Sequence, residues 1–251
     1  MDLGISGRVA LVMGASRGIG RAIAGTLARE GARVALSSRS AERLREAADE
    51  IGGETATFEA DTGDLERIAA LPAEVAERLG AIEILVTNTG GPAAGGALAH
   101  GTEEWRAAYE SLVLAPRVLI EAALPGMRAR SWGRIVNVGS TSTVEPIPQL
   151  GLSNVHRSAA VAFFKTLARE VAVDGITVNT VATGRFATDR LAELEGGSLE
   201  PAIERAREQV PAVRLGEPDE YGDLVAFLCS RRAAYVTGTV IPIDGGLLRS
   251  V

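Results

Sequence analysis

The sequence is poor in cysteine, lysine and aromatic residues. It contains one cysteine, Cys229, one lysine, Lys165, and only 4% aromatic residues. A single thiol cannot form a disulfide within the chain, so we expect a reducing, cytoplasmic location. Nucleic-acid-binding proteins neutralise phosphates with basic residues and stack bases on aromatic rings, whereas this chain carries a net charge of −6. A nucleic-acid partner is therefore not expected.

Long hydrophobic segments are also missing. No apolar run reaches the roughly 18 residues that span a bilayer, and the first apolar run has only the length of a strand. We therefore expect neither a signal peptide nor a membrane span. With 251 residues and 46% hydrophobic content, the chain can bury the core of one large α/β domain, which we assign to residues 1–251.

The apolar residues gather in short β-branched runs separated by helical patterns. The runs cover residues 8–13, 33–38, 55–60, 82–87, 134–139, 176–181 and 239–243. The clearest helical patterns cover residues 21–31, 41–51, 103–124 and 153–173. This alternation predicts βαβ units and a single Rossmann-type, doubly wound parallel sheet of seven strands, with helices on both faces.

The segment at about 184–212 differs from the rest of the chain. It is polar, has a helical pattern, and is interrupted by Gly196, Gly197 and Pro201. Because it precedes the last predicted strand, we interpret it as a lid-like insertion that covers a pocket.

A glycine-rich loop, GASRGIG, follows the first predicted strand. Gly14 permits a tight turn, Gly18 lets the backbone approach a pyrophosphate, and Gly20 lets the following helix pack against the strand. The N–H groups at the start of that helix would then face the phosphates. In this βαβ context the loop predicts a dinucleotide site.

The end of the second predicted strand indicates which dinucleotide binds. NAD sites place a carboxylate there for the ribose 2′-OH, whereas this strand ends in Ser37, Ser38 and Arg39. Arg17 in the glycine loop adds a second guanidinium, and two guanidiniums suit a 2′-phosphate. NADP(H) is therefore favoured over NAD(H). The alternative is that Arg39 lies on a solvent-facing turn and binds no phosphate, in a protein that is rich in arginine.

Several motifs together resemble the short-chain dehydrogenase/reductase family. GASRGIG resembles its cofactor loop, NTGG at 88–91 its Asn-Asn-Ala-Gly motif, and RIVNVGS the strand that carries its catalytic serine, here Ser140. VNTVATG at 178–184 resembles its Asn-x-Val-x-Pro-Gly segment, with Thr183 where proline is common. The likeness covers essentially the whole chain and is greatest to 3-oxoacyl-[acyl-carrier-protein] reductases.

This resemblance implies a cofactor site built from many parts of the chain. The residues assigned to it are Gly14, Ser16, Arg17, Gly18, Ile19, Gly20, Ser38, Arg39, Asp61, Thr62, Asn88, Gly90, Arg157 and Gly184. The resemblance further implies a small-molecule carbonyl or acyl-carrier substrate, no metal, and a homotetramer assembled through the two long helices and the last strand.

Most of the catalytic residues that the resemblance implies are replaced. The family uses a tyrosine as proton donor, a lysine that lowers its pKa, a serine that orients the carbonyl and an asparagine that holds a water. Ser140 is kept, but Ser153, Arg157 and Leu112 stand at the tyrosine, lysine and asparagine positions. A serine hydroxyl is a much weaker acid than a phenol, and arginine does not release its proton. Losing a positioned acid typically costs about 10²–10⁴ in rate.

Two interpretations therefore stay open. The chain is either an oxidoreductase with an atypical site made by Ser140, Ser153 and Arg157, or a catalytically inactive dinucleotide-binding sensor or scaffold subunit. His156 and Tyr109 are candidate replacement acids, with packing or an interface as the alternative for both. His100 is expected on the surface.

Overall fold

Seven parallel strands form one sheet in the structure, a computed structural model that describes residues 1–250. The strands are β1 (Val9–Met13), β2 (Arg33–Ser38), β3 (Thr55–Glu59), β4 (Ile84–Thr87), β5 (Gly133–Val138), β6 (Ile176–Thr183) and β7 (Val240–Ile243). Their order across the sheet is β3-β2-β1-β4-β5-β6-β7. The predicted doubly wound parallel sheet is confirmed.

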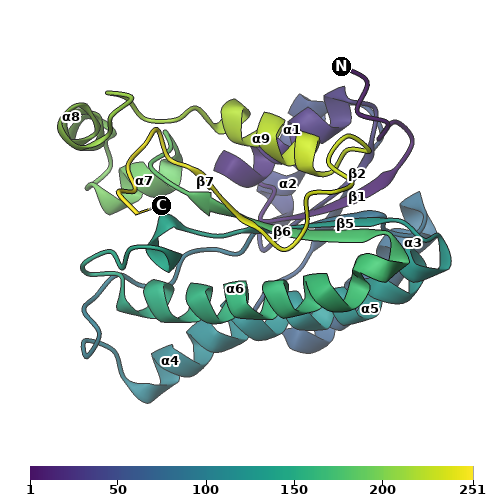
Figure 1. Ribbon diagram of the computed structural model, residues 1–251, viewed down its shortest axis with the longest axis horizontal. Coiled ribbons are helices and arrows are strands. Elements are labelled where there is room, and N and C mark those ends of the chain that lie inside the picture. The colour runs from purple at the N-terminus through teal and green to yellow at the C-terminus, as the bar shows by residue number, and fades with distance from the viewer. Residues whose placement is uncertain (251) are drawn as a thin grey trace.

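Helices cover both faces of the sheet (Figure 1). One face carries α1 (Gly18–Arg29), α2 (Ala41–Ile51) and α9 (Pro218–Leu228). The other face carries α3 (Leu65–Leu79), α4 (Thr102–Tyr109), α5 (Ala115–Ala129) and α6 (Gly151–Val171). The remaining elements are η1 (Glu110–Leu114), η2 (Thr141–Thr143), η3 (Ala172–Asp174), α7 (Asp189–Leu194) and α8 (Glu200–Gln209). Within residues 1–250, no helix combines the length and the hydropathy that a bilayer crossing requires.

The strands are apolar on both sides because each side faces its own core. In β1, Val9, Leu11 and Met13 join the cluster that includes Phe164 of α6. The alternate residues of β1 join the opposite cluster, which includes Ile23 of α1. This two-sided burial explains the uninterrupted apolar runs in the sequence.

The helix predicted over residues 103–124 is split by a π-helical turn, η1, between α4 and α5. Pro116 has no N–H to donate to the carbonyl of Leu112, four residues earlier, so the regular α-helical hydrogen-bond ladder cannot continue there. The wider π turn accommodates this break. The side chain of Leu112 lies in the turn and is only 4% exposed.

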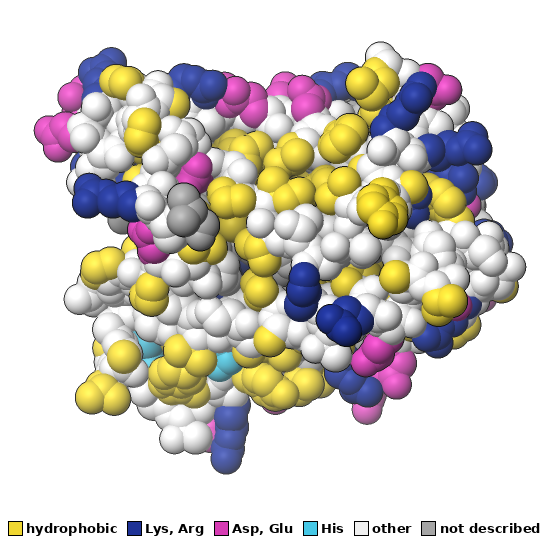
Figure 2. All heavy atoms as spheres, in the orientation of Figure 1, with side chains coloured by type: hydrophobic (Ala, Val, Ile, Leu, Met, Phe, Trp, Pro, Cys, Tyr) yellow, Lys and Arg dark blue, Asp and Glu magenta, His cyan; other side chains and the backbone are white. Residues whose placement is uncertain are grey.

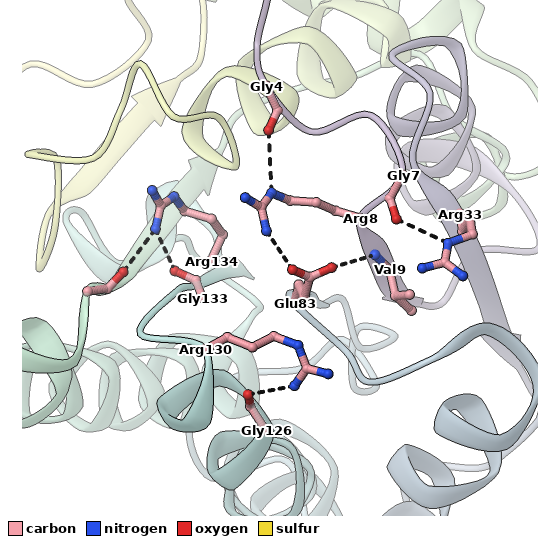
Figure 3. Close-up of polar contacts among 11 residues, drawn as sticks. Gly4, Gly7, Arg8, Val9, Arg33, Glu83, Gly126, Arg130, Gly133 and Arg134 are labelled. Atoms are coloured by element: carbon pink, nitrogen blue, oxygen red, sulfur yellow. Dashed lines mark hydrogen bonds and ion pairs between the residues drawn. The ribbon is translucent and has the colours of Figure 1, made fainter.

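An ion pair ties β1 to β4 at the amino edge of the sheet (Figure 3). The Arg8 guanidinium donates to one carboxylate oxygen of Glu83, and the other oxygen accepts from the backbone N–H of Val9 at 3.3 Å. Because Glu83 lies just before β4, the pair fixes the relative position of two adjacent strands.

A buried arginine holds the same edge farther along the sheet. Arg134 of β5 is 2% exposed and donates to the carbonyls of Gly133 at 2.8 Å (Figure 3), Gly175 at 3.2 Å and Ser230 at 3.2 Å. Its guanidinium carbon also lies 4.5 Å from the centroid of the Trp132 ring. Burial lowers the pKa of this guanidinium, but the hydrogen bonds to three carbonyls keep the charge solvated inside the fold.

We therefore expect Arg134→Met to destabilise the protein by about 2–4 kcal/mol, because three buried carbonyls lose their donor. Urea unfolding followed by circular dichroism measures this loss. Arg130→Met is the matched control, because Arg130 is exposed and bonds only to the Gly126 carbonyl. Equal stability of the two variants would show that the Arg134 bonds do not stabilise the fold.

Candidate active site

The candidate site lies at the carboxyl edge of the sheet. The strand order reverses between β1 and β4. In doubly wound sheets such a reversal is where the loops after the strands diverge and leave a crevice for a ligand. The structure brings predicted residues from five strand ends to this edge: Gly14, Ser38, Asp61, Asn88 and Ser140. Sequence positions that lie far apart therefore meet in one place.

The glycine loop leaves no room for side chains. Gly14 has φ +61°, and a Cβ atom there would lie 2.7 Å from the carbonyl oxygen of Asn88. A Cβ atom on Gly20 would overlap the carbonyl oxygen of Gly14. The Asn88 side chain donates from Nδ2 to that same oxygen at 3.4 Å, which joins the loop after β4 to the loop after β1.

The start of α1 fits an anionic group. Its N-cap residue, Arg17, makes no side-chain capping bond, and no acidic residue lies in the first turn, which contains Ile19. The first N–H groups therefore have no capping side chain, and the helix dipole favours a negative charge beside them. Ser16 precedes this turn and is partly exposed. These features suit the pyrophosphate of a dinucleotide.

The side chains predicted to bind the adenosine half of the dinucleotide differ in their exposure to solvent. The side chain of Arg39 is 77% exposed, and its Nη1 lies 4.0 Å from an oxygen of Asp61. Asp61 also accepts from the backbone N–H of Gly63 at 2.9 Å. Ser37 is fully buried, and its hydroxyl has no hydrogen-bond partner among residues 1–250. This hydroxyl is enclosed by the core and cannot contact a phosphate at the strand end.

Two further predicted cofactor residues are tied to neighbouring elements. The hydroxyl of Thr62 lies 2.7 Å from that of Ser111 in the π turn. Gly184 follows β6, and its N–H donates to Ile243 of β7 at 3.0 Å. By contrast, Gly90 is exposed, and a Cβ atom there would meet nothing within 4 Å.

The glycine loop is linked to α7 by an ion pair. The guanidinium of Arg17 binds the carboxylate of Glu193 through both oxygens, the longer contact being 3.3 Å. This bond raises the pKa of Arg17 and lowers the pKa of Glu193. Thr188, at the start of α7, lies close to Gly18, since a Cβ atom on that glycine would be 3.5 Å from its methyl group. Arg17 is therefore held by the protein's own carboxylate.

The segment at 184–212 forms a small unit of its own, seen at one end of the molecule in Figure 1. Ala202, Ala206 and Val210 of α8 and its end form a cluster with Leu215. Their spacing of four residues accounts for the helical pattern expected of this segment. Backbone bonds between residues 185–187 and Gly216 join the two ends of the segment.

Ser140 and Arg157 come together at the end of β5. The hydroxyl of Ser140 accepts from the N–H of Ser142 at 3.1 Å and keeps its own proton free to donate. Arg157 of α6 donates from Nη1 to the carbonyl of Val138 at 2.9 Å, and burial lowers the pKa of its guanidinium. Ser153, one turn earlier on α6, is 8% exposed. The Ser140 hydroxyl therefore lies only two residues beyond Val138, the residue whose carbonyl binds the Arg157 cation.

Asn154 is a site residue that the sequence did not indicate. Its Nδ2 donates to the carbonyl of Ile147 at 2.9 Å, and its Oδ1 accepts from the N–H of the same residue at 3.3 Å. These two hydrogen bonds fix the loop after Ser140 to the start of α6. The one sequence signal that could have indicated it is the ability of an asparagine side chain to imitate a peptide group.

His156 packs against α4. It is 6% exposed, and its Nδ1 lies 2.8 Å from the carbonyl of Leu152, so that nitrogen carries the proton. Its ring centroid lies 5.1 Å from that of Trp105 and 6.3 Å from that of Tyr109. The packing alternative therefore describes His156 in this fold. His100, expected on the surface, is half-buried, and its ring nitrogen Nε2 is shielded from solvent.

Comparisons with known proteins agree with this geometry. Residues 14–248 match the family model described as enoyl-(acyl carrier protein) reductase. The chain is 36% identical over 247 residues to the 3-oxoacyl-[acyl-carrier-protein] reductase of Vibrio cholerae, covering 98% of this chain and 99% of that protein. It is 37% identical over 253 residues to the corresponding reductase of Pseudomonas aeruginosa, covering 99% of this chain and all of that protein.

A solved structure with a similar fold is L-sorbose reductase from Gluconobacter frateurii in complex with NADPH and L-sorbose. Its TM-score is 0.93 and its identity 35%, with 100% of both chains covered. The chain belongs to the short-chain dehydrogenase/reductase family of oxidoreductases. Members of this family use a nicotinamide dinucleotide.

The Arg17–Glu193 pair predicts a pH-dependent attachment of α7. Because the pKa of Glu193 is lowered from 4.5, the attachment is complete above 4.5 and is lost as the pH falls through the lowered value. We expect Glu193→Gln to speed hydrogen exchange of the α7 amides roughly twofold to fivefold at neutral pH, as for an exposed ion pair. It should also remove the pH dependence.

Exchange rates corrected for intrinsic chemistry, measured from neutral to acidic pH, test this expectation. Glu204→Gln is the control, because Glu204 pairs only with Arg207 within α8. Identical α7 exchange in the unaltered protein and Glu193→Gln would rule out the attachment.

Proposed function

We propose that the protein is an NADP(H)-dependent oxidoreductase that reduces a carbonyl of the 3-oxoacyl type. The observation that carries this proposal is the meeting of Ser140 and Arg157 at the end of β5, beside a crevice whose glycine loop fits a pyrophosphate. The curated relatives are 3-oxoacyl-[acyl-carrier-protein] reductases, which supports an acyl-carrier substrate. L-Sorbose reductase supports a carbonyl substrate more generally.

The preference for NADP(H) rests on two guanidiniums. Arg39 is exposed at the end of β2, where a 2′-phosphate would lie, and Arg17 is nearby in the glycine loop. Arg17 must exchange its carboxylate partner, Glu193, for the phosphate. The segment at 184–212 then serves as a lid whose position depends on the cofactor. The NADPH bound to the similar L-sorbose reductase supports this preference.

The chain's own residues divide the chemistry between them. A bound nicotinamide supplies the hydride. Ser140 donates a hydrogen bond to the substrate carbonyl, and the fixed charge of Arg157 stabilises the negative charge that develops on that oxygen. Neither a serine hydroxyl nor a guanidinium is acidic enough to deliver the proton, so the proton comes from bulk solvent, relayed by water in the room left by the short side chain of Ser153.

A second candidate function is dinucleotide binding without turnover. It is favoured by the replacements at Ser153 and Arg157 and by Leu112, whose buried apolar side chain cannot hold a water where the family has an asparagine. In this case the protein acts as a sensor or as a scaffold subunit. Cofactor binding is common to both candidates, and only turnover separates them.

We also propose a homotetramer in the cytoplasm. Apolar side chains gather over β7 and α9 and again between α4 and α6 (Figure 2). Tyr109 and Val155 are 44% and 51% exposed on the second surface.

The single cysteine is buried and its pKa is raised to about 12, so it is unreactive.

Turnover tests the proposal. We expect NADPH oxidation with a panel of 3-oxoacyl thioesters and ketoses, and Ser140→Ala should lower kcat by about 10²–10³ while NADPH binding stays within about twofold. Ser158→Ala, an exposed position on α6, is the control. NADPH binding without turnover on any substrate would favour the second candidate instead. Full activity of Ser140→Ala would overturn the assignment of this serine.

A further inference from the structure

Thr183 and Tyr221 form a hydrogen-bonded pair beneath the crevice. Thr183 is the last residue of β6 and is partly exposed, whereas Tyr221 of α9 is fully buried. Their hydroxyl oxygens lie 3.0 Å apart. Threonine stands where the related family commonly has proline, which has no side-chain hydroxyl. The pair is therefore particular to this chain's site.

The phenol also reaches the backbone of β6. The Tyr221 hydroxyl lies 3.2 Å from the carbonyl oxygen of Val181, which already accepts from the N–H of Gly139 at 2.8 Å. Burial raises the pKa of Tyr221 well above its ordinary value of 10.0, so the phenol stays neutral and keeps its proton. It acts as a hydrogen-bonding group and not as an acid.

The Thr183–Tyr221 pair and Arg157 contact neighbouring positions at the ends of β5 and β6. Val138 of β5 and Val181 of β6 are partners in the sheet register. Arg157 donates to the carbonyl of Val138 from the α6 face, and Tyr221 reaches the carbonyl of Val181 from the α9 face. The two side chains therefore close the ends of β5 and β6 from opposite sides.

Tyr221 also supports the entrance to the 184–212 segment. Its ring packs edge to face on Phe186, with centroids 5.3 Å apart. Phe186 is 5% exposed and packs against Gly216 at the other end of the segment. The tyrosine thus holds both the end of β6 and the point where the chain leaves it.

We propose that Thr183 and Tyr221 are a positioning pair for the nicotinamide half of the cofactor, with the Thr183 hydroxyl accepting from the carboxamide N–H. In a doubly wound fold the second half of the sheet, β4 to β6, holds the second nucleotide, and Thr183 ends that half. This inference rests on the proposed dinucleotide function.

The direction of the hydrogen bonds follows from the available donors. The carboxamide N–H donates to Thr183, Thr183 donates to Tyr221, and Tyr221 donates to the carbonyl of Val181. Every proton then has an acceptor, and the chain ends on a backbone carbonyl with a free lone pair. Such connected bonds strengthen one another inside a protein.

The test uses two ligands that differ in the nicotinamide half. Calorimetry measures binding of NADPH and of adenosine 2′,5′-bisphosphate, which lacks the nicotinamide nucleotide. We expect Thr183→Val and Tyr221→Phe each to weaken NADPH binding about fivefold to tenfold, the size of one hydrogen bond, and to leave adenosine 2′,5′-bisphosphate unchanged. The double variant should bind NADPH no more weakly than either single variant, because the two residues act as one unit.

Thr183→Ser keeps the hydroxyl and should bind NADPH as the unaltered protein does. Tyr235→Phe makes the same chemical change at a fully exposed residue and is the control. Unchanged NADPH affinity in both single variants, or equal weakening of both ligands, would overturn the positioning pair. If the unaltered protein binds adenosine 2′,5′-bisphosphate, the dinucleotide function stands whatever the variants show. Failure to bind either ligand would overturn that function and the pair with it.

Discussion

The close approach of α1 to the loop after β1 is the constraint on which the site depends. Gly20 touches the turn at Gly14, and that turn is held in place by Asn88 from the loop after β4. The start of α1 is therefore fixed beside the point where the strand order reverses. A helix start without a capping side chain, next to such a crevice, binds phosphate through its free N–H groups. The rest of the site is arranged around this anchor.

At the end of β5, the residues that replace the family's catalytic ones keep some of their physical properties and lose others. Arg157 preserves a positive charge at the end of β5, held by the Val138 carbonyl, but a guanidinium cannot serve as a proton carrier. Ser140 preserves a hydroxyl with a free proton. A strong acid is missing from these positions, and Tyr221, the phenol beside the end of β6, is buried and its pKa is raised. In the proposed reaction these residues bind and polarise the carbonyl, and the proton comes from solvent.

The fold could be predicted from the sequence because two-sided burial leaves long apolar strands and glycine spacing marks the first turn. The location of Ser140 and the glycine loop followed in the same way, since both lie at strand ends, and the position of Arg157 in α6 followed from the family resemblance. The partners of side chains could not be predicted. Nothing in the sequence indicates that Ser37 turns inward, that Glu193 reaches Arg17 across 176 residues, or that Thr183 bonds to Tyr221. Such contacts depend on packing between elements distant in the chain.

The most direct measurement is calorimetric titration of the unaltered protein with NADPH and NADH, side by side with a variant carrying Arg17→Gln and Arg39→Gln. The account predicts that NADPH binds at least about tenfold more tightly than NADH and that the variant loses this difference, because each guanidinium contributes a charge-assisted bond to the 2′-phosphate. Failure of the unaltered protein to bind either dinucleotide would contradict the account at its base. Equal affinity for the two would contradict the role of both arginines.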